Sequence, residues 1–294
     1  MGIKIIADSL SDISQQEAKA LDILILPLTV RFGESEYTDG ITLDPQTFYE
    51  KLTSEKELPK TSQIAPFTYQ QAFEEALQAG DQVLCITGSS GVSGCFQSAR
   101  LAAEEVRRKA GDPEDFREQL VIIDSKQATA SEYVLVQYAV SLRNAGMEFL
   151  PLVEAVKAAA KKVRLIALLD TLEYLKKGGR ISGTAAAVGS LLAIKPLVTF
   201  ENGVVEIIGK ARGYKNAHAH LLQMLSHYGG IDFSKPFVAG FAGTDDSLLR
   251  QHVADSPDIF GEDYGSVPVT RVGPTIGTYT GPGTVVFGFF TDEE

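Results

Sequence analysis

Short apolar runs alternate with amphipathic stretches through the first half of this chain, and no other feature restricts the possible folds as strongly. The apolar runs are rich in β-branched residues and almost continuous, which is typical of strands buried on both faces of a parallel sheet. Four such strands are expected, at residues 3–7, 23–30, 82–87 and 120–124. Strands separated by helices form βαβ units, so this half predicts a parallel sheet.

Capping residues and glycines mark the helix boundaries between these strands. Asp44 followed by Pro45 is an N-cap with proline at the first helical position, and Gly80 and Gly111 end two later helices. The expected helices are residues 45–51, 68–79, 93–109, 129–144 and 150–162. The fold class predicted for the first half is therefore α/β, a doubly wound, mostly parallel sheet with helices on both faces.

The pattern changes at about residue 164, where paired strands replace the alternation. Residues 192–200 and 204–209 flank Asn202-Gly203, a dipeptide that strongly favours a β-hairpin. Further strands are expected at residues 164–169, 237–241, 267–272 and 284–290, and a helix at residues 216–228. This half predicts an α+β domain with a mainly antiparallel sheet, so we expect two domains, residues 1–160 and 161–294.

Composition excludes several classes of protein. The 294 residues are 44% hydrophobic, which suits a folded core, and carry 27 Lys and Arg against 38 Asp and Glu, a net charge of −11. Such a chain has no general field that attracts polyanions, so nucleic acid is not the expected partner. Its two cysteines, Cys85 and Cys95, are too few for a disulfide framework, and no apolar run reaches the ~20 residues that span a bilayer. We expect a cytoplasmic protein without a transmembrane segment.

Small hydroxyl residues are concentrated at the ends of the predicted strands. They occur in the segments 8–12 (DSLSD), 61–63 (TSQ), 89–94 (SSGVSG) and 124–125 (DS). In open α/β sheets ligands bind beyond the carboxyl ends of the strands, close to helix N-termini that favour anions. Any one of these segments could be only a turn or a helix cap. Four of them at one edge predict a shared site for a small anion.

Familiar catalytic motifs do not match the spacing of these segments. Residues 88–94 lack the Gly-Lys-Ser/Thr ending of a phosphate loop, and Cys95 replaces the last glycine of a nucleophile elbow. His218 and His220 are two positions apart in a predicted helix and therefore point in different directions. We expect no metal site, no cofactor and no catalytic residues.

Two further segments stand out in the second half. Residues 273–283 (GPTIGTYTGPG) contain glycines and prolines that fix a particular backbone path, either for a close approach or simply for a tight turn. Residues 170–181 predict a short helix that ends in two glycines and a basic tip of Lys176, Lys177 and Arg180. Basic residues also commonly complement the dipole at a helix C-terminus.

Taken together, these segments resemble the DegV family, and the resemblance extends from about residue 3 to residue 290. The matching motifs are DSLSD at 8–12, TSQ at 61–63, SSGVSGCFQSA at 89–99, LEYLKKGGRI at 172–181, IKP at 194–196 and IGT with GPG at 276–283. Each motif is weak alone, but their order and intervals are jointly specific. The resemblance implies a two-domain α/β protein that buries one long-chain fatty acid between its domains.

Some members of this family are the fatty-acid-binding subunit of bacterial fatty acid kinase. By that resemblance, a separate ATP-dependent kinase subunit would phosphorylate the bound carboxylate to an acyl phosphate, and this chain would be a carrier without catalytic activity. Thr61 and Ser93 match the hydroxyls that bind the carboxylate, with Ser62 beside them. Arg180 matches an exposed basic position implicated in docking the kinase. Tyr279 stands where the family usually has histidine, so it can offer the carboxylate a hydroxyl but not a positive charge.

Two other functions remain open at this point. The protein could be a lipid-binding regulator whose partner is not a kinase. It could also be an esterase with Ser93 as its nucleophile, although no histidine base stands in any matching motif.

Overall fold

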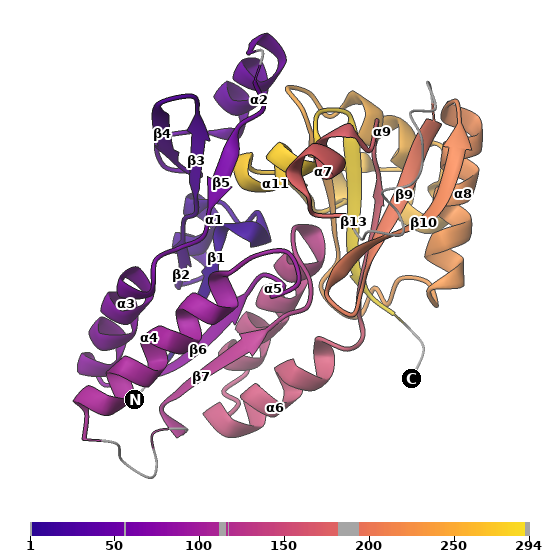
Figure 1. Ribbon diagram of the computed structural model, residues 1–294. Helices are drawn as coiled ribbons and strands as arrows, with labels where there is room; N and C mark the ends of the chain where they lie inside the picture. The colour runs from indigo at the N-terminus through magenta and orange to yellow at the C-terminus, as the bar shows by residue number, and fades with distance from the viewer. Residues whose placement is uncertain (1, 56, 112–115, 117, 182–193, 292–294) are drawn as a thin grey trace.

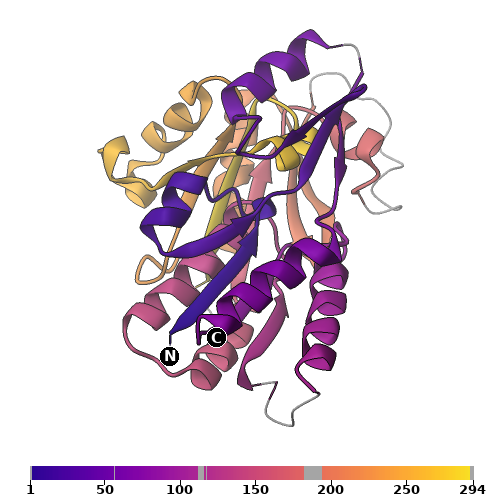
Figure 2. The ribbon, with the colours of Figure 1, turned by 90° about the vertical axis from the view of Figure 1, so that its left-hand side faces the viewer.

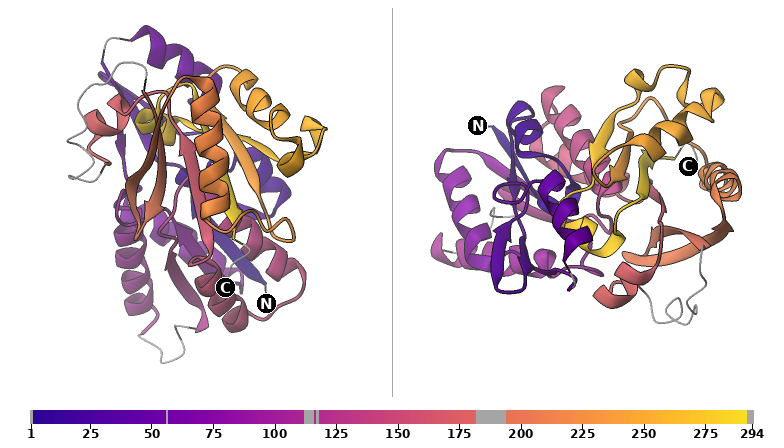
Figure 3. Two further views of the ribbon diagram at one scale, coloured as in Figure 1. Left: turned by 90° about the vertical axis from the view of Figure 1, so that its right-hand side faces the viewer. Right: turned by 90° about the horizontal axis from the view of Figure 1, so that it is seen from above.

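The computed structural model describes residues 2–55, 57–111, 116, 118–181 and 194–291 (Figure 1). Within these residues no helix is both long and apolar enough to cross a bilayer. The chain forms two main sheets that lie side by side, the first built from indigo to magenta strands and the second from salmon to yellow strands, as the view from above shows (Figure 3).

The first sheet is parallel and has the strand order β2-β1-β6-β7. Its strands are β1 (Ile3–Asp8), β2 (Ile23–Leu26), β6 (Gln82–Thr87) and β7 (Leu120–Asp124). Helices lie on both faces of this sheet, as expected for connections between parallel strands. On one face α3 (Pro66–Gln78) and α4 (Cys95–Lys109) pack together against β6, and on the other α1 (Gln15–Ala20) packs on β2 and α5 (Ala130–Asn144) on β1. The prediction of a doubly wound sheet is confirmed.

The expected strand at residues 23–30 is wrong in one respect, because it breaks at Pro27. Pro27 has no N–H for a sheet ladder, and the N–H of Leu28 bonds to the Ser9 hydroxyl instead of to a neighbouring strand. The chain after this break enters a separate antiparallel sheet, β4-β3-β5, that lies with α2 (Pro45–Ser54) beyond the end of the parallel sheet (Figures 1 and 2). Its strands are β3 (Thr29–Phe32), β4 (Ser35–Thr38) and β5 (Lys60–Ser62).

The second main sheet has six strands in the order β10-β9-β8-β13-β11-β12. Every neighbouring pair is antiparallel except β11 and β12, so the prediction of a mainly antiparallel sheet is confirmed. Its strands are β8 (Val163–Leu168), β9 (Ile194–Glu201), β10 (Val204–Arg212), β11 (Val238–Ala242), β12 (Val269–Arg271) and β13 (Thr284–Phe290). The expected start of β9 at residues 192–193 lies outside the described residues.

Helices cover the outer face of this sheet, and α5 covers the inner face. The outer helices include α8 (Tyr214–His227), which packs on β10, β8 and β9, and α9 (Ser247–Ala254), which packs on β11 (Figure 3). On the inner side α5 packs on β13, β8 and β11 while also contacting β1, so it lies between the two sheets. Helix α6 (Phe149–Ala159) packs on α5. Strands β1–β7 precede the expected domain boundary between residues 160 and 161, and strands β8–β13 follow it. The exact boundary stays a prediction.

The glycine- and proline-rich segment at residues 273–283 contains a helix, α11 (Pro274–Thr280), rather than only a turn. Pro274 occupies the first helical position, where its fixed φ favours the helix, and Gly281 ends it at φ +71°. The expected short helix before Arg180 is α7 (Glu173–Gly178), which packs against α11. These two short helices place Arg180 and Tyr279 together.

Candidate functional site

The site is centred on Tyr279, at the C-terminal end of α11. Its hydroxyl lies 2.6 Å from the Thr61 Oγ1 on β5, although 218 positions separate the two residues in the chain. The ring of Tyr279 lies against Gly178, where a Cβ would come within 2.3 Å of the ring carbons, so glycine is required there. One hydroxyl of the pair donates to the other, which leaves the second O–H proton available for a ligand.

Arg180 lies over the ring of Tyr279. Its Cζ is 4.7 Å from the ring centroid, which is cation–π distance. The guanidinium also donates to the carbonyls of Gly178, at 2.6 Å, and Val92, at 3.4 Å. The Arg180 side chain is half-buried rather than exposed, whereas Lys177 of the same basic tip is exposed. Packing on Tyr279 and bonds to two carbonyls fix Arg180 beside the Tyr279–Thr61 pair. Its expected role in docking a kinase subunit stays a prediction.

Ser93 and Ser62 are placed differently from Thr61. Ser93 precedes α4, next to Val92, and its Oγ accepts from the N–H of Cys95 at 3.3 Å. Ser62 is exposed and follows Thr61 on a strand, where successive side chains point to opposite faces. The structure therefore brings Thr61 and Arg180 each into contact with Tyr279. It places Ser93 beside Val92, whose carbonyl accepts from Arg180, and it directs Ser62 away from Thr61.

An apolar cavity begins at these polar groups, with Val92, Arg180 and Tyr279 in its wall. Its other walls come from both halves of the molecule: Leu10 and Ala128 from the first, and Leu165, Ala167, Val198 and Val286 from the inner face of the second sheet. The cavity is narrow, with a volume of about 70 Å³. An apolar space with a few polar groups at one place is typical of a site for an amphipathic small molecule.

The comparisons with known proteins decide the family. The family model described as "Uncharacterised protein, DegV family" matches residues 2–292. A DegV domain-containing protein of Caldanaerobacter subterraneus is 31% identical over 297 residues, 99% of each chain. The chain belongs to the DegV family.

Solved structures of DegV proteins share this fold. A fatty-acid-binding DegV family protein from Thermus thermophilus is 28% identical with a TM-score of 0.84, over 99% of this chain and 100% of that one. The Fatty Acid Kinase B3 protein of Streptococcus pneumoniae, loaded with linoleic acid, is 24% identical with a TM-score of 0.82, over 99% of this chain and 100% of that one. At 24% identity, the similarity to the Streptococcus pneumoniae protein shows a shared fold only.

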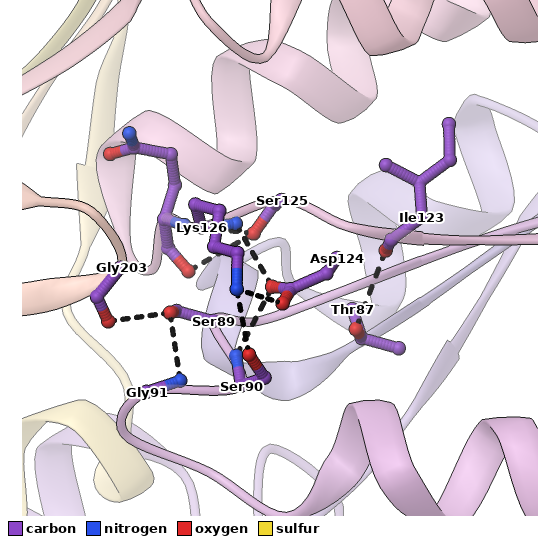
Figure 4. A network of polar contacts seen from close by, with 10 residues as sticks. Thr87, Ser89, Ser90, Gly91, Ile123, Asp124, Ser125, Lys126 and Gly203 are labelled. Carbon is purple, nitrogen blue, oxygen red and sulfur yellow. Dashed lines mark hydrogen bonds and ion pairs between the residues drawn. The ribbon is translucent and has the colours of Figure 1, made fainter.

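Three serines in two of the hydroxyl segments predicted for the anion site bond within this DegV protein. In the segment 8–12, Ser9 donates to Asp39, and Ser11 donates to the carbonyl of Asp8; both serines are buried. In the loop after β6, Ser89 donates to the carbonyl of Gly203 at 2.6 Å and so fastens the β9–β10 hairpin to the first half (Figure 4).

Asp124 organises the same loop from the end of β7. One of its oxygens accepts from the N–H groups of Ser90 and Lys126, and the other lies 2.6 Å from the Lys126 Nζ (Figure 4). The Lys126 Nζ also donates to the Ser90 hydroxyl at 2.9 Å. These bonds lower the pKa of Asp124, although burial opposes the shift. The Ser89 hydroxyl, the Ser90 hydroxyl and the Lys126 ammonium of this network therefore all have partners within the protein.

The first half contains a group of buried carboxyls that the sequence did not predict. Burial raises the pKa of Asp8 to about 7, that of Asp12 to about 8 and that of Asp39 to about 6, and it raises the pKa of Glu132 well above the ordinary value. The two Asp residues of the segment 8–12 were visible in the sequence, but nothing in it showed that they are buried. Asp39 and Glu132 carry no local sequence signal of this kind.

The histidines form a pair that the sequence did not predict. His218 Nδ1 on α8 lies 2.8 Å from His252 Nδ1 on α9, while His218 Nε2 faces the carbonyl of Asp255 at 3.4 Å. A carbonyl only accepts, so His218 carries its proton on Nε2 and its Nδ1 accepts from His252. The Nε2 of His252 is then a buried lone pair with no partner among the described residues. Among all the residues that the structure describes, no group of three or more His, Cys, Asp or Glu could hold a metal ion.

This pair predicts an acid-dependent loss of stability. Burial, and then repulsion from His218, lowers the pKa of His252 to about 4. The unfolded chain takes up this proton near pH 6.5, so stability is lost as the pH falls from about 6.5 to 4. Between pH 7 and pH 4.5 we expect the stability advantage of the wild type over His252→Asn, measured by urea unfolding, to fall by about 2 kcal/mol. The exposed His227→Asn is the control, and a constant difference between wild type and His252→Asn would contradict the prediction.

Proposed function

We propose that this DegV protein binds one long-chain fatty acid, with its carboxylate at Tyr279, Thr61 and Ser93 and its alkyl chain in the apolar cavity, which must widen from about 70 Å³ to bury the whole chain. The observation that carries the proposal is that Tyr279, whose hydroxyl bonds to Thr61, lines the wall of a mainly apolar cavity. Each buried CH₂ contributes about 0.8 kcal/mol, so a long chain supplies roughly 10 kcal/mol before the cost of association. The fatty-acid-binding relative from Thermus thermophilus supports the same ligand class.

Hydroxyls suffice to satisfy such a carboxylate. The Tyr279–Thr61 pair uses one of its two O–H protons internally and can donate the other, and the guanidinium of Arg180 over the Tyr279 ring adds positive charge close by. A carboxylate held mainly by neutral donors keeps more negative charge than one in a bidentate ion pair. This would leave it able to attack the γ-phosphorus of ATP, with ADP as the leaving group.

Removing either hydroxyl tests the head-group site. We expect Thr61→Val and Tyr279→Phe each to weaken fatty acid binding by about 1 kcal/mol, because the remaining hydroxyl loses the partner that orients it toward the carboxylate. The measurement is calorimetric titration of delipidated protein with a fatty acid and with the alcohol of the same chain length. The alcohol should lose less affinity than the acid.

The exposed Ser62→Ala is the matched control, and we expect it to bind like the wild type. Mass spectrometry of an organic extract of the purified protein provides an independent test, in which we expect a stoichiometric fatty acid. Protein that neither carries nor binds fatty acid would overturn the proposal.

We further propose that a separate kinase subunit phosphorylates the bound carboxylate and that Arg180 assists this step. Arg180 is the basic residue placed at the carboxylate site, since it lies on Tyr279 and lines the cavity. With a fatty acid kinase subunit and saturating lipid, we expect Arg180→Ala to slow acyl phosphate formation about tenfold, because the positive charge beside the bound carboxylate, where phosphoryl transfer takes place, is removed. Lys177→Ala removes a nearby exposed cation that pairs with Glu173 and should have little effect.

The two alternatives make different predictions for these experiments. A regulator without a kinase partner would bind fatty acid but support no acyl phosphate formation with any kinase subunit. For an esterase Ser93 would need a base, but its side chain bonds to the N–H of Cys95, and the four histidines all lie on α8 and α9 at the second sheet. The carrier is therefore the function that the geometry supports best.

A further inference from the structure

Helix α11 begins without a cap of its own. Its N-cap residue is Gly273, which has no side chain, so its first N–H groups need acceptors from elsewhere. Two buried carboxyls of the first half supply them. Asp12 Oδ1 accepts from the N–H of Gly273 at 2.8 Å, and Asp39 Oδ2 accepts from the N–H of Thr275 at 3.3 Å.

Both carboxyls are themselves held in place. The Thr129 hydroxyl donates to Asp12 Oδ2 at 2.6 Å, and the Ser9 hydroxyl donates to Asp39 Oδ2 at 2.9 Å. The side chains of Asp12 and Asp39 are buried, and Asp12 has a left-handed backbone with φ +56°. The acceptors for α11 are therefore fixed points of the first half, not mobile surface groups.

The body of α11 has no room to move independently of its ends. A Cβ at Gly277 would come within 2.6 Å of Phe48 and of the Tyr49 hydroxyl, so α2 lies directly against the helix backbone. The Tyr49 hydroxyl donates to the carbonyl of Val272, just before the helix, at 3.1 Å. At a rise of 1.5 Å per residue, Tyr279 lies only about 8 Å along the axis from Pro274.

From this arrangement we infer that Asp12 and Asp39 are positioning residues for the carboxylate site. By accepting hydrogen bonds from the N–H groups at the start of α11, they fix the position of the helix along its axis relative to the first half of the molecule. This position places the Tyr279 hydroxyl opposite Thr61. They act through α11 and do not touch the ligand. The inference rests on the proposed function for its ligand, but the position of α11 can be measured without any ligand.

The two acceptors can be removed without straining the backbone. Asp12→Gly deletes the carboxyl at a position where φ is positive and glycine is favoured. Asp12→Asn keeps an oxygen for the N–H of Gly273 and offers an amide to the Thr129 hydroxyl, so it should restore the position of α11. Asp8→Ala is the matched control: Asp8 is equally buried, but its oxygens accept from Leu10 and Gly88 and not from α11.

The first measurement is hydrogen exchange of the amides of residues 275–281 in ligand-free protein. Asp12→Gly should speed exchange of these amides at least tenfold, whereas Asp12→Asn and Asp8→Ala should leave it within about threefold of the wild type. Asp39→Ala, which removes the acceptor for Thr275, should act as Asp12→Gly does and serves in its place if that variant does not fold. Unchanged exchange over α11 in the folded variant would overturn the inference, whatever the ligand is.

The second measurement is the ratio of affinities for a fatty acid and for the alcohol of equal length. Asp12→Gly should lower this ratio about tenfold, and Asp12→Asn should restore it. Adding Tyr279→Phe to Asp12→Gly should cause no further loss, because both changes remove the same hydroxyl from the site. Additive losses, or a ratio that also falls in Asp8→Ala, would overturn the inference. A wild type that does not prefer the acid would instead count against the proposed function.

Discussion

Ala167→Phe is expected to abolish fatty acid binding while the protein remains folded. Ala167 lies on β8 with 2% of its surface exposed and lines the cavity beside Val198, its partner in register on β9. The added ring must enter a cavity of about 70 Å³, which it would block. Excluding four or more CH₂ groups from burial costs about 3 kcal/mol, so affinity should fall by about 100-fold or more. Titration of delipidated protein with a fatty acid checks this.

A substitution on the other face of β8 distinguishes a blocked cavity from a general loss of stability as the cause of weaker binding. Ile166 points away from the cavity into the core beneath α8 and α9, so Ile166→Phe overpacks that core and should destabilise the protein by about 1–3 kcal/mol. Its fatty acid affinity should remain that of the wild type. If both variants bound normally, the alkyl chain would lie outside this cavity.

Gly288→Ala, which adds a single methyl group, is expected to lower the free energy of unfolding strongly. Gly288 lies on β13, where a Cβ would come within 2.1 Å of the Ala130 carbonyl oxygen and 2.2 Å of its carbon, at the start of α5. Both contacts are with backbone, so no side-chain rotation can relieve them. Helix α5 lies between the two sheets and would have to move away from β13. We expect the free energy of unfolding to fall by about 3 kcal/mol, the upper end for overpacking, as measured by urea denaturation.

Gly209→Ala provides the comparison for this substitution. Gly209 also lies on a strand, β10, but a Cβ there would meet Leu197 at 3.6 Å, an ordinary contact distance. Its effect should stay within about 1 kcal/mol of zero. Equal effects of the two substitutions would mean that the packing of α5 on β13 adjusts easily.

The sequence predicted most of the elements because their signals are local. Strands β1, β6 and β7 and helices α4 and α5 were expected within a few residues of their observed bounds, from buried β-branched runs and glycine stops. The Asn202-Gly203 turn predicted the β9–β10 hairpin, which the structure confirms. Strand β5 and helix α11 were not predicted, because three residues and a Gly-Pro-rich run carry too little periodicity.

In the candidate site, too, some features were determined by the sequence and others only by the tertiary structure. The sequence by itself determined the residue types and their order: hydroxyls at 61 and 93, a basic tip at 180 and a tyrosine at 279, in motifs that resemble the DegV family. Only the tertiary structure decided that the Tyr279 hydroxyl lies on Thr61, that Arg180 packs on the Tyr279 ring, and that Ser9, Ser11 and Ser89 bond within the protein. Local patterns fix backbone conformation, whereas these contacts, apart from that of Ser11 with Asp8, join residues 30 to 218 positions apart. Such contacts depend on how the sheets pack, and no local signal specifies that packing.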